Sequence, residues 1–456
     1  MHLIPISYPK SIIIKDNVQS KLTKDNLYSE NWEIINTPKG RDILVLVKQG
    51  LLFLIEPSDG INVTEIQNFE QQIGLFTKQP LGQLQTYYNS LTLVIEHRCN
   101  FKCSYCFAIE HGVCFSGSVK SMPFNDIRTS IDWFFQQLPS GKKGSITLFG
   151  GEPLIHKEII RVINYIKNRK CKDKIKCEII IFTNGSLITP ELVDEIKYDY
   201  DIKIMLSIDG PPSINDSSRM LLNGKESSSL VLMGISLLKD LELERIIARI
   251  TLNDVPVKIV ERVQYLNSIG LNNVAIDVAY SGCDSINKYI EMFKSLTEEL
   301  NDLAEYYKKC ILTSKKININ IFSEPVAKIL SSKVNLKENC QCPAGKTIVA
   351  VDSDLTVYPC HRYVGLERYA IGKLQSMSNN CDTVTTIEKY CANCWCQRLC
   401  GNLCPSIMDE IRYDAQVIEA YCTYQKKRIE YAIDLIVDIY GHHLPHEKLW
   451  QNIRII

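Results

Sequence analysis

The chain lacks a surplus of charge of either sign, because 52 Lys and Arg residues balance 52 Asp and Glu residues. A protein that binds the nucleic-acid backbone needs a basic face, so we expect no nucleic-acid partner. No apolar run reaches transmembrane length; the nearest, residues 44–55, is interrupted by Lys48 and Gln49. The N-terminus also lacks a charged segment followed by a long apolar one, which argues against a signal peptide. We therefore expect a cytoplasmic protein without a membrane span.

Cysteine is absent from residues 1–88, whereas the whole chain contains 18. In a reducing compartment, closely spaced cysteines are more often metal ligands than disulfide partners. Hydrophobic residues make up 45% of the chain, which is enough for sizeable cores. A length of 456 residues suggests about three domains. The sequence therefore predicts a globular protein whose metal chemistry lies after residue 88.

The first cysteine group follows an apolar run at residues 91–95 and has the spacing C-x3-C-x2-C. Its members are Cys99, Cys103 and Cys106. Thiolates select zinc or iron–sulfur clusters. A structural zinc site needs a fourth ligand, which Cys114 or His111 could supply. A cubane cluster held by three thiolates instead keeps one iron open for a substrate or cofactor. The spacing alone leaves both interpretations open.

A second motif, Gly150-Gly151-Glu152-Pro153, follows the next strand-like run. In this order, the two motifs resemble those of the radical S-adenosylmethionine (SAM) superfamily. The resemblance implies that Cys99, Cys103 and Cys106 are catalytic and hold a [4Fe–4S] cluster, whose open iron binds the amino and carboxylate groups of SAM. One electron from that cluster breaks the sulfonium bond and releases a 5′-deoxyadenosyl radical. The second motif therefore favours a cluster over zinc.

Between residues 91 and 280, short apolar runs alternate with longer amphipathic segments. This pattern predicts parallel strands joined by right-handed helical crossovers. The expected strands are 91–96, 145–149, 178–182, 202–208, 245–251 and 273–278, and the expected helices are 124–137, 157–168, 190–199, 229–238 and 256–269. Six such units resemble the partial (β/α)6 barrel of the superfamily, an α/β fold with its chemistry at the carboxyl ends of the strands. We expect this barrel to span residues 89–318 and to end in a linker helix over 291–307.

The resemblance also assigns SAM-binding roles to residues at the strand ends. Ser207 and Arg219 would bind the methionyl carboxylate, for which Arg offers a bidentate fork. Asp209 would contact the ribose or shape its turn. The other implied residues are Gly150, Gly151 and Glu152 for the methionyl ammonium, the backbone near Tyr105 and Phe107 for the adenine, and Arg249 as a further site-facing side chain. The alternative for each is an ordinary turn residue or a solvated side chain.

Residues 1–88 form the expected N-terminal domain. Two apolar runs at 42–47 and 51–56 predict a β-hairpin, and residues 62–75 predict a helix. A hairpin followed by small helices resembles the PqqD-like, winged-helix-like recognition element of peptide-modifying radical SAM enzymes. The resemblance implies that the leader of a precursor peptide adds as a strand to the hairpin edge. The alternative is a purely structural extension.

The C-terminal domain, expected over residues 319–456, contains a second cysteine group with the spacing C-x2-C-x5-C-x3-C. It resembles the SPASM domain, which binds two auxiliary [4Fe–4S] clusters and so implies three clusters in all. By that resemblance the outer cluster is held by Cys391, Cys394, Cys400 and Cys422, and the inner one by Cys342, Cys360 and Cys404. Cys340 is an alternative early ligand, and if it does not bind, the inner cluster has an open iron. A pair of zinc knuckles is the competing interpretation.

This region departs from the family's pattern at one glycine, and the chain also contains cysteines outside the two motifs. The glycine of the family's G-x4-C pattern is Leu355 here, and a turn at residues 352–354 is expected to replace it. The segment 415–440 predicts a helix. The remaining cysteines are expected to be packing residues or free thiols: Cys114, Cys171, Cys177, Cys283 and Cys310 in the first class, Cys381 and Cys396 in the second.

The resemblance as a whole implies an oxidoreductase that matures a ribosomally made peptide. Its partners would be a precursor peptide with a leader and an electron donor such as flavodoxin or ferredoxin. The favoured product is a thioether from a cysteine sulfur to a carbon. Alternatives are a carbon–carbon or carbon–oxygen crosslink, a non-catalytic electron carrier, and anaerobic sulfatase maturation. In the last family a catalytic Asp follows the cysteine matching Cys360, and here that position is His361.

Overall fold

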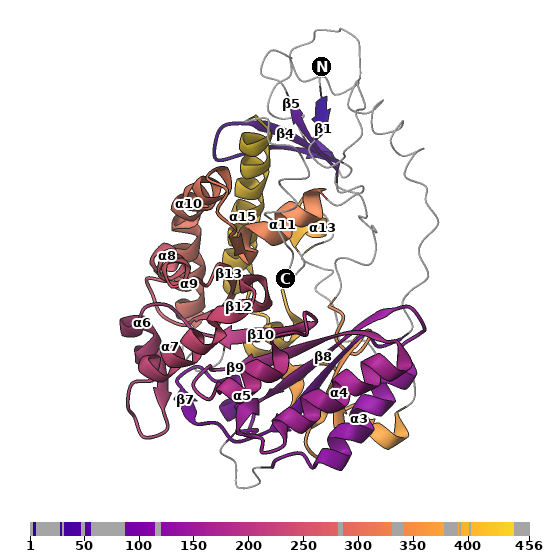
Figure 1. Cartoon of the computed structure of the whole chain (residues 1–456). Coiled ribbons are helices and arrows are strands. Elements are labelled where there is room, and N and C mark those ends of the chain that lie inside the picture. Colours follow the sequence, from indigo (N-terminus) through magenta and orange to yellow (C-terminus); the bar gives the residue numbers. More distant parts are fainter. Residues whose placement is uncertain are drawn as a thin grey trace, which may run out of the picture.

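The computed structural model describes residues 3–5, 28–29, 32–46, 51–55, 87–114, 120–280, 286–330, 342–377, 391, 394–400 and 403–441. Within them the chain forms a ten-stranded, mostly parallel sheet and a separate five-stranded antiparallel sheet (Figure 1). The large sheet has the order β14-β13-β12-β10-β9-β8-β6-β15-β16-β17. The helix expected over 62–75 lies outside the described residues, as do Cys283, Cys340 and Cys381.

The six expected strands form the central part of this sheet. They are β6 (Ser90–Glu96), β8 (Lys143–Gly150), β9 (Lys176–Thr183), β10 (Ile202–Ser207), β12 (Ile246–Leu252) and β13 (Asn273–Val278). All neighbouring pairs among them are parallel. The α/β prediction is therefore confirmed, and each strand lies within two residues of its predicted bounds.

Helices connect these strands as the pattern predicts. They are α3 (Phe124–Gln137), α4 (Ile159–Asp173), α5 (Pro190–Ile196), α7 (Ser228–Leu237) and α8 (Ile259–Ser268). The start of α5 has a clear local cause, because the Thr189 hydroxyl accepts a hydrogen bond from the Leu192 backbone N–H and Pro190 occupies the first turn. Figure 1 shows α3, α4 and α5 beside the strands that they connect, so the sheet is shielded on this face.

The C-terminal region continues the same sheet. Strand β15 (Ile348–Val351) pairs in parallel with β6, and β16 (Thr356–Tyr358) and β17 (Gly372–Lys373) follow antiparallel. The turn between β15 and β16 contains Leu355 at a φ of 65°, a left-handed conformation that favours glycine. At the family's glycine position this chain therefore has a backbone conformation that favours glycine. Because β15 lies beside β6, the C-terminal region adjoins the strand that leads into the first cysteine group.

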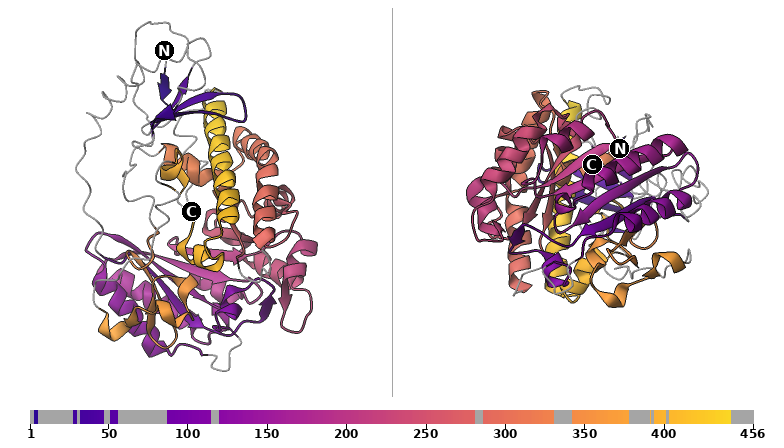
Figure 2. Two further views of the ribbon diagram at one scale, coloured as in Figure 1. Left: turned by 180° about the vertical axis from the view of Figure 1, so that it is seen from behind. Right: turned by 60° about the horizontal axis from the view of Figure 1, so that its bottom comes forward.

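At the other end of the sheet, β14 (Asn318–Ile319) pairs with β13, and helices cover this side. The helices are α9 (Ile286–Glu298), α10 (Leu300–Leu312), α11 (Asn320–Leu330) and α15 (Ala415–Gly441). The single linker helix expected over 291–307 is wrong, because the chain breaks the helix at Glu299 and continues as α10. The helix expected over 415–440 is confirmed as α15, which lies against α9, α10 and α11 in both views of Figure 2.

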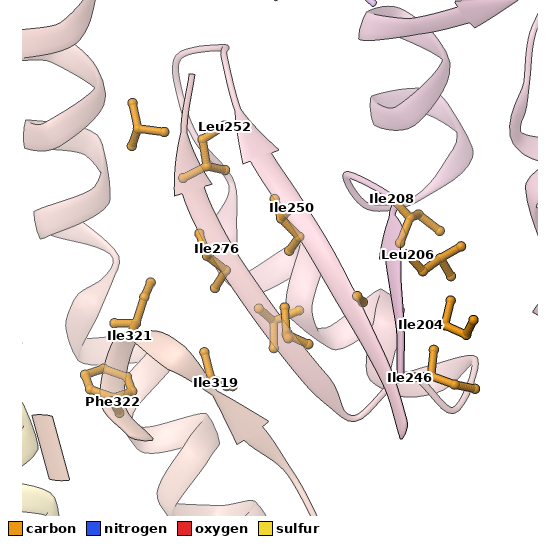
Figure 3. Packing of buried hydrophobic residues seen from close by; sticks show 14 of the residues in the cluster. Ile204, Leu206, Ile208, Ile246, Ile250, Leu252, Ile276, Ile319, Ile321 and Phe322 are labelled. Atoms are coloured by element: carbon orange, nitrogen blue, oxygen red, sulfur yellow. The ribbon is translucent and has the colours of Figure 1, made fainter. Parts of the chain in front are cut away.

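A cluster of hydrophobic side chains, most of them branched aliphatic, packs against the central strands of the sheet. Figure 3 shows Leu206 of β10, Ile250 of β12 and Ile276 of β13 pointing into one cluster, together with Ile319 and Phe322 near its far end. Each of these five residues is at most 7% exposed. Burying one such side chain stabilises the fold by about 1.5–3 kcal/mol. This packing makes the strands a rigid frame for the polar residues at their ends.

The five-stranded sheet comes from the N-terminal part of the chain and has the order β1-β5-β4-β3-β2. Its strands are β1 (Leu3–Pro5), β2 (Tyr28–Ser29), β3 (Trp32–Asn36), β4 (Asp42–Leu46) and β5 (Leu51–Ile55). Strands β4 and β5 pair antiparallel, with Ile43 opposite Leu54, so the expected hairpin is confirmed. The sheet lies at the end of α15 in Figure 1.

A polar clamp joins this sheet to α15. The Thr37 hydroxyl donates to Asp434 Oδ1 at 2.8 Å, and Arg41 donates from Nη1 to the same oxygen at 2.7 Å. Arg41 Nη2 and Lys39 Nζ donate to the two oxygens of Asp438 at 2.5 and 2.6 Å. The side chains of Asp434 and Asp438 are only 2% and 11% exposed. The loop between β3 and β4 is therefore held to the helix by largely buried charges.

We expect the substitution Asp438→Asn to loosen the N-terminal sheet by about 1–3 kcal/mol, because it removes the largely buried carboxylate that Arg41, Lys39 and Lys308 share. Limited proteolysis should then cut before residue 87 faster than in the wild type. Burial alone would raise the pKa of Asp438, but hydrogen bonds from Lys39 and Lys308 outweigh it and lower that pKa. The stabilisation is thus complete above pH about 4 and is lost as the pH falls below that value. Asp302→Asn, an exposed change on α10, is the control; equal cleavage of both variants would contradict the clamp.

Candidate active site

The first cysteine group lines a cavity of about 170 Å³ at the carboxyl ends of the strands. Cys99 follows β6, Cys103 ends β7 (Phe101–Cys103) and Cys106 precedes α2 (Phe107–Glu110). Strand β7 pairs antiparallel with β11 (Arg219–Leu221), and Arg219 stands opposite Cys103. The cysteine loop is therefore fastened to the segment that follows β10.

These three thiols are suited to hold a positively charged group. Burial raises the pKa of all three, to about 11 for Cys103, where Arg219 opposes the rise. Cys103 raises the pKa of Cys99, and Cys106 raises that of Cys103, so the thiols are close enough to repel one another as thiolates. Buried thiolates gathered in this way are stable only with a compensating cation, as in a metal centre. The donor set thus fits an iron–sulfur cluster.

Asp209 organises the wall beside the cysteine loop. Its buried carboxylate accepts hydrogen bonds from the Tyr105 hydroxyl at 2.5 Å and from the Thr251 backbone N–H at 2.8 Å. Arg219 donates to both of its oxygens, from Nε at 2.9 Å and from Nη2 at 3.0 Å. With a further bond from Ser218, the carboxylate is saturated by protein donors. Of the two roles expected for Asp209, this geometry favours shaping the site.

The Gly-Gly-Glu motif brings the end of β8 against the entry to the cysteine loop. The backbone N–H groups of Gly151 and Glu152 donate to the carbonyls of Glu96 and Arg98, at 2.8 and 2.9 Å. Gly150 has a φ of 146°, and a Cβ atom there would collide with the Glu96 carbonyl oxygen. Two glycines are therefore required for this close approach.

The Glu152 carboxylate is 1% exposed and bridges two strand ends. It accepts hydrogen bonds from the Asn184 backbone N–H at 2.7 Å, from the Leu154 backbone N–H at 3.0 Å and from the Thr183 hydroxyl at 2.9 Å. Burial raises the pKa of Glu152 to about 7, and the two backbone hydrogen bonds oppose that rise. The carboxylate lines the cavity in a fixed orientation, ready to accept from a cation such as an ammonium group.

The far wall of the cavity is formed by residues from β12, β13 and the segment after Cys360. Arg249 and Asp277 form an ion pair there. His361 packs against the Phe149 ring, with centroids 5.1 Å apart. Burial, followed by the charges of Arg362 and Arg249, lowers the pKa of His361 to about 3. This wall therefore presents a neutral imidazole near the guanidinium groups of Arg362 and Arg249, the second of which is paired with Asp277.

Nearly all predicted site residues of the barrel meet at this one cavity. Its lining includes the three cysteines and Tyr105, Phe107, Gly150, Gly151, Glu152, Ser207, Arg219 and Arg249. Asp209 lies behind Arg219 and Tyr105. Asp277 and Arg362 also line the cavity and were not predicted, and Cys114, expected to be a zinc ligand or a packing residue, lines it as well. The position of Asp277 at the end of the sixth strand was a usable signal for it, whereas nothing in the sequence marked Arg362.

The second cysteine region gathers its thiols in two sets. Cys404 raises the pKa of both Cys342 and Cys360, so these three thiols are neighbours. Cys340, the alternative ligand, lies outside the described residues. The other set lines one small cavity and consists of Cys391, Cys394, Cys396, Cys400 and Cys422. Among the described residues no three His, Cys, Asp or Glu side chains converge on one metal-ion position; a cubane, with each thiolate on a different iron, needs a wider spacing than a single zinc ion.

Comparison with known proteins agrees with the geometry. Residues 93–254 match the Radical SAM superfamily. Protein MJ0907 of Methanocaldococcus jannaschii, which is uncharacterized, is 32% identical over 41% of this chain, and the match spans 62% of that relative's length. The cysteine-type anaerobic sulfatase-maturating enzyme of Clostridium perfringens is 24% identical over 75% of this chain and 95% of its own.

Two further likenesses come from a shorter relative and a solved structure. The radical SAM cyclopropyl synthase TigE of Paramaledivibacter caminithermalis is 28% identical over 39% of this chain and 38% of its own. The structure of native anSMEcpe with bound AdoMet and the Cp18Cys peptide has a TM-score of 0.63 at 21% identity, covering 78% of this chain and 99% of that one. The structural likeness concerns the fold. In the part of the chain that the structure describes, no helix has the length and apolar character of a membrane span.

Proposed function

Because residues 93–254 form a radical SAM domain, we propose that this chain is an oxidoreductase that modifies a peptide by joining a cysteine sulfur to a carbon atom. The observation that carries the proposal is the convergence of three groups on one cavity: the cysteine triad, the Gly-Gly-Glu turn and the cationic far wall. A cluster held by the triad would bind SAM and supply the 5′-deoxyadenosyl radical. The protein's task is then to fix the cofactor and to hold the peptide against it.

Two locked side chains are suited to fix the methionyl end of SAM. Arg219 is held by Asp209 through two hydrogen bonds, so its guanidinium has one orientation beside Cys103. Glu152 is held by three hydrogen bonds from the ends of β8 and β9. A cation and a carboxylate that line the same cavity as the cysteine triad match the carboxylate and ammonium of an amino acid. Since both are pre-oriented, binding costs little side-chain entropy.

The far wall suits a cysteine substrate. Arg362 and Arg249 create the positive potential that, after burial, lowers the pKa of His361. The same potential would lower the pKa of a substrate thiol and favour its thiolate, which is the form that reacts with carbon. His361 stays neutral and can hydrogen-bond to sulfur or to the peptide backbone. These residues support a peptide cysteine as the sulfur donor.

Sulfatase maturation is the second candidate, because the Clostridium perfringens relative is a cysteine-type anaerobic sulfatase-maturating enzyme. That family has an Asp base after the cysteine matching Cys360. Here the residue is His361, so this position lacks the carboxylate that acts as the base in that family. This difference favours the thioether. A carbon–carbon bond is the third possibility, since the relative TigE is a cyclopropyl synthase.

The proposed reaction balances as a two-electron oxidation of the peptide. One S–H and one C–H bond break, and one S–C bond forms. The carbon-bound hydrogen ends on 5′-deoxyadenosine, the thiol proton goes to solvent, and one electron passes to an acceptor. The inner thiol set is a suitable holder for that acceptor, because Cys360 directly precedes the cavity residues His361 and Arg362. An external flavodoxin or ferredoxin would supply the electron that cleaves SAM.

The test is anaerobic incubation of the reconstituted enzyme with SAM, a reductant and a cysteine-containing peptide encoded beside its gene. We expect 5′-deoxyadenosine and a peptide that has lost two hydrogens and one alkylatable thiol. A product in which oxygen replaces sulfur would establish sulfatase-type maturation instead. A product that has lost two hydrogens but alkylates at every cysteine would indicate a carbon–carbon or carbon–oxygen bond. If no 5′-deoxyadenosine formed, the non-catalytic electron carrier would be the function that remains among those considered.

For the N-terminal domain we propose leader recognition at an edge of the five-stranded sheet, where β1 and β2 are the outermost described strands. Removing residues 1–29 deletes these two strands but keeps the loop that clamps α15. This truncation should reduce modification of the full-length peptide at least tenfold, while 5′-deoxyadenosine formation without substrate persists. A leaderless peptide should be modified equally slowly by both proteins. If the truncated and wild-type proteins modified the full-length peptide at equal rates, residues 1–29 would have only a structural role.

A further inference from the structure

Cys396 lies inside the outer thiol set, although its spacing predicts a free thiol. It is the most buried of the five cysteines that line this cavity, at 2% exposure, whereas the four predicted ligands are half-buried. Nothing in the C-x2-C-x5-C-x3-C pattern includes it. The outer set therefore offers five thiols to a cluster that takes four.

The contacts of Cys396 show which ligand it duplicates. Its Sγ lies 3.4 Å from Cys394 Sγ, and its thiol also hydrogen-bonds to Cys400. The backbone explains this closeness: Cys396 precedes α13 (Gln397–Cys400), and its carbonyl accepts from the Cys400 N–H at 2.8 Å. Cys394 and Cys396 are two residues apart on the tight turn before this helix. Their sulfur atoms therefore point to the same corner of the cavity.

Each iron of a cubane binds one protein thiolate, so two sulfur atoms in contact cannot serve different irons without moving apart. We propose that Cys394 and Cys396 are interchangeable ligands of one iron in the outer auxiliary cluster, an inference that rests on the proposed presence of that cluster. The thiol that is not bound donates its S–H to the bound thiolate, because a thiolate has no hydrogen to give. A spare ligand at this corner protects the cluster against loss of one cysteine.

Iron and sulfide counting on the anaerobically reconstituted full-length enzyme tests this proposal. We expect about twelve irons in the wild type and in each of the single variants Cys394→Ala and Cys396→Ala, and about eight in the double variant. The double variant Cys394→Ala with Cys310→Ala is the matched control, because Cys310 is buried in α10 far along the chain from this set. It should keep about twelve irons. Electron paramagnetic resonance of the reduced single variants should show an altered auxiliary signal, since each loses the S–H···S bond.

The possible results separate the ligand pair from the cluster itself. Loss of about four irons in Cys394→Ala alone would overturn the proposal and restore Cys396 as a free thiol. Loss of about four irons in Cys396→Ala alone would also overturn the proposal, because Cys396 would then be the sole ligand at that corner. Cys422→Ala, which removes a predicted ligand of the same cavity for which Cys396 is no neighbour, should lose about four irons and confirms that the folded protein tolerates an empty outer site. A wild type with only about four irons would instead overturn the auxiliary clusters, and the ligand pair with them.

Discussion

Replacing Cys99, Cys103 and Cys106 together by Ala should lower the bound iron from about twelve to about eight atoms per chain. The same variant should form no 5′-deoxyadenosine above background. The reason lies in the cavity, where these thiols are the buried ligands closest to the Gly-Gly-Glu turn and to Arg219. Without them Cys114 is the one thiol left in the lining among the described residues, and a single thiolate cannot hold a cubane that delivers the electron. Iron and sulfide counting and chromatography of the nucleoside products measure both effects.

The control for the triple variant is Cys171→Ala, because Cys171 is exposed on α4 away from the cavity. It should keep the full iron content and SAM cleavage. Persistent cleavage of SAM in the triple variant would contradict the assignment of the radical site. Tightly bound zinc with little iron in the wild type would contradict the cluster interpretation altogether. The two outcomes are distinct, because the first leaves the auxiliary clusters intact and the second removes all of them.

Local sequence patterns predict the central strands and helices because each of these strands is itself an apolar run that becomes buried. Six runs of Ile, Val and Leu alternate with amphipathic segments, and the parallel order follows from the right-handed crossovers between them. The same logic puts the ends of β6, β8 and β10 at one edge, so Cys99, Gly150 and Ser207 are expected to meet there. They do line one cavity.

Contacts between distant side chains could not be predicted in this way. The bond from Tyr105 to Asp209 and the pairing of β7 with β11 depend on how a loop folds back over more than a hundred residues. Cys396 lies outside the cysteine spacing pattern, and its place in a cavity follows from the turn that brings it there. The clamp between Arg41 and Asp434 joins opposite ends of the chain. Periodicity and spacing are local signals, and these features are not local.

Replacing Cys360 by Ala should leave 5′-deoxyadenosine formation in place but stop crosslinking of the peptide. Cys360 is 8% exposed and is close to Cys342 and Cys404, so its loss removes one of the inner cluster's ligands. It also directly precedes His361 and Arg362 in the cavity wall. The radical would still form at the first cluster, yet the electron released when sulfur joins carbon would have no acceptor beside the substrate.

The decisive measurement is the ratio of crosslinked peptide to 5′-deoxyadenosine, with Cys310→Ala as a buried control that touches neither thiol set. We expect the ratio to fall at least a hundredfold in Cys360→Ala and to stay at the wild-type value in the control. The variant should also lose up to about four irons, which shows that the inner cluster was affected. Loss of both 5′-deoxyadenosine and product would instead mean that Cys360 supports the SAM site through its neighbours. Crosslinking at the wild-type ratio would exclude the inner cluster as the electron acceptor, because an external acceptor would then suffice.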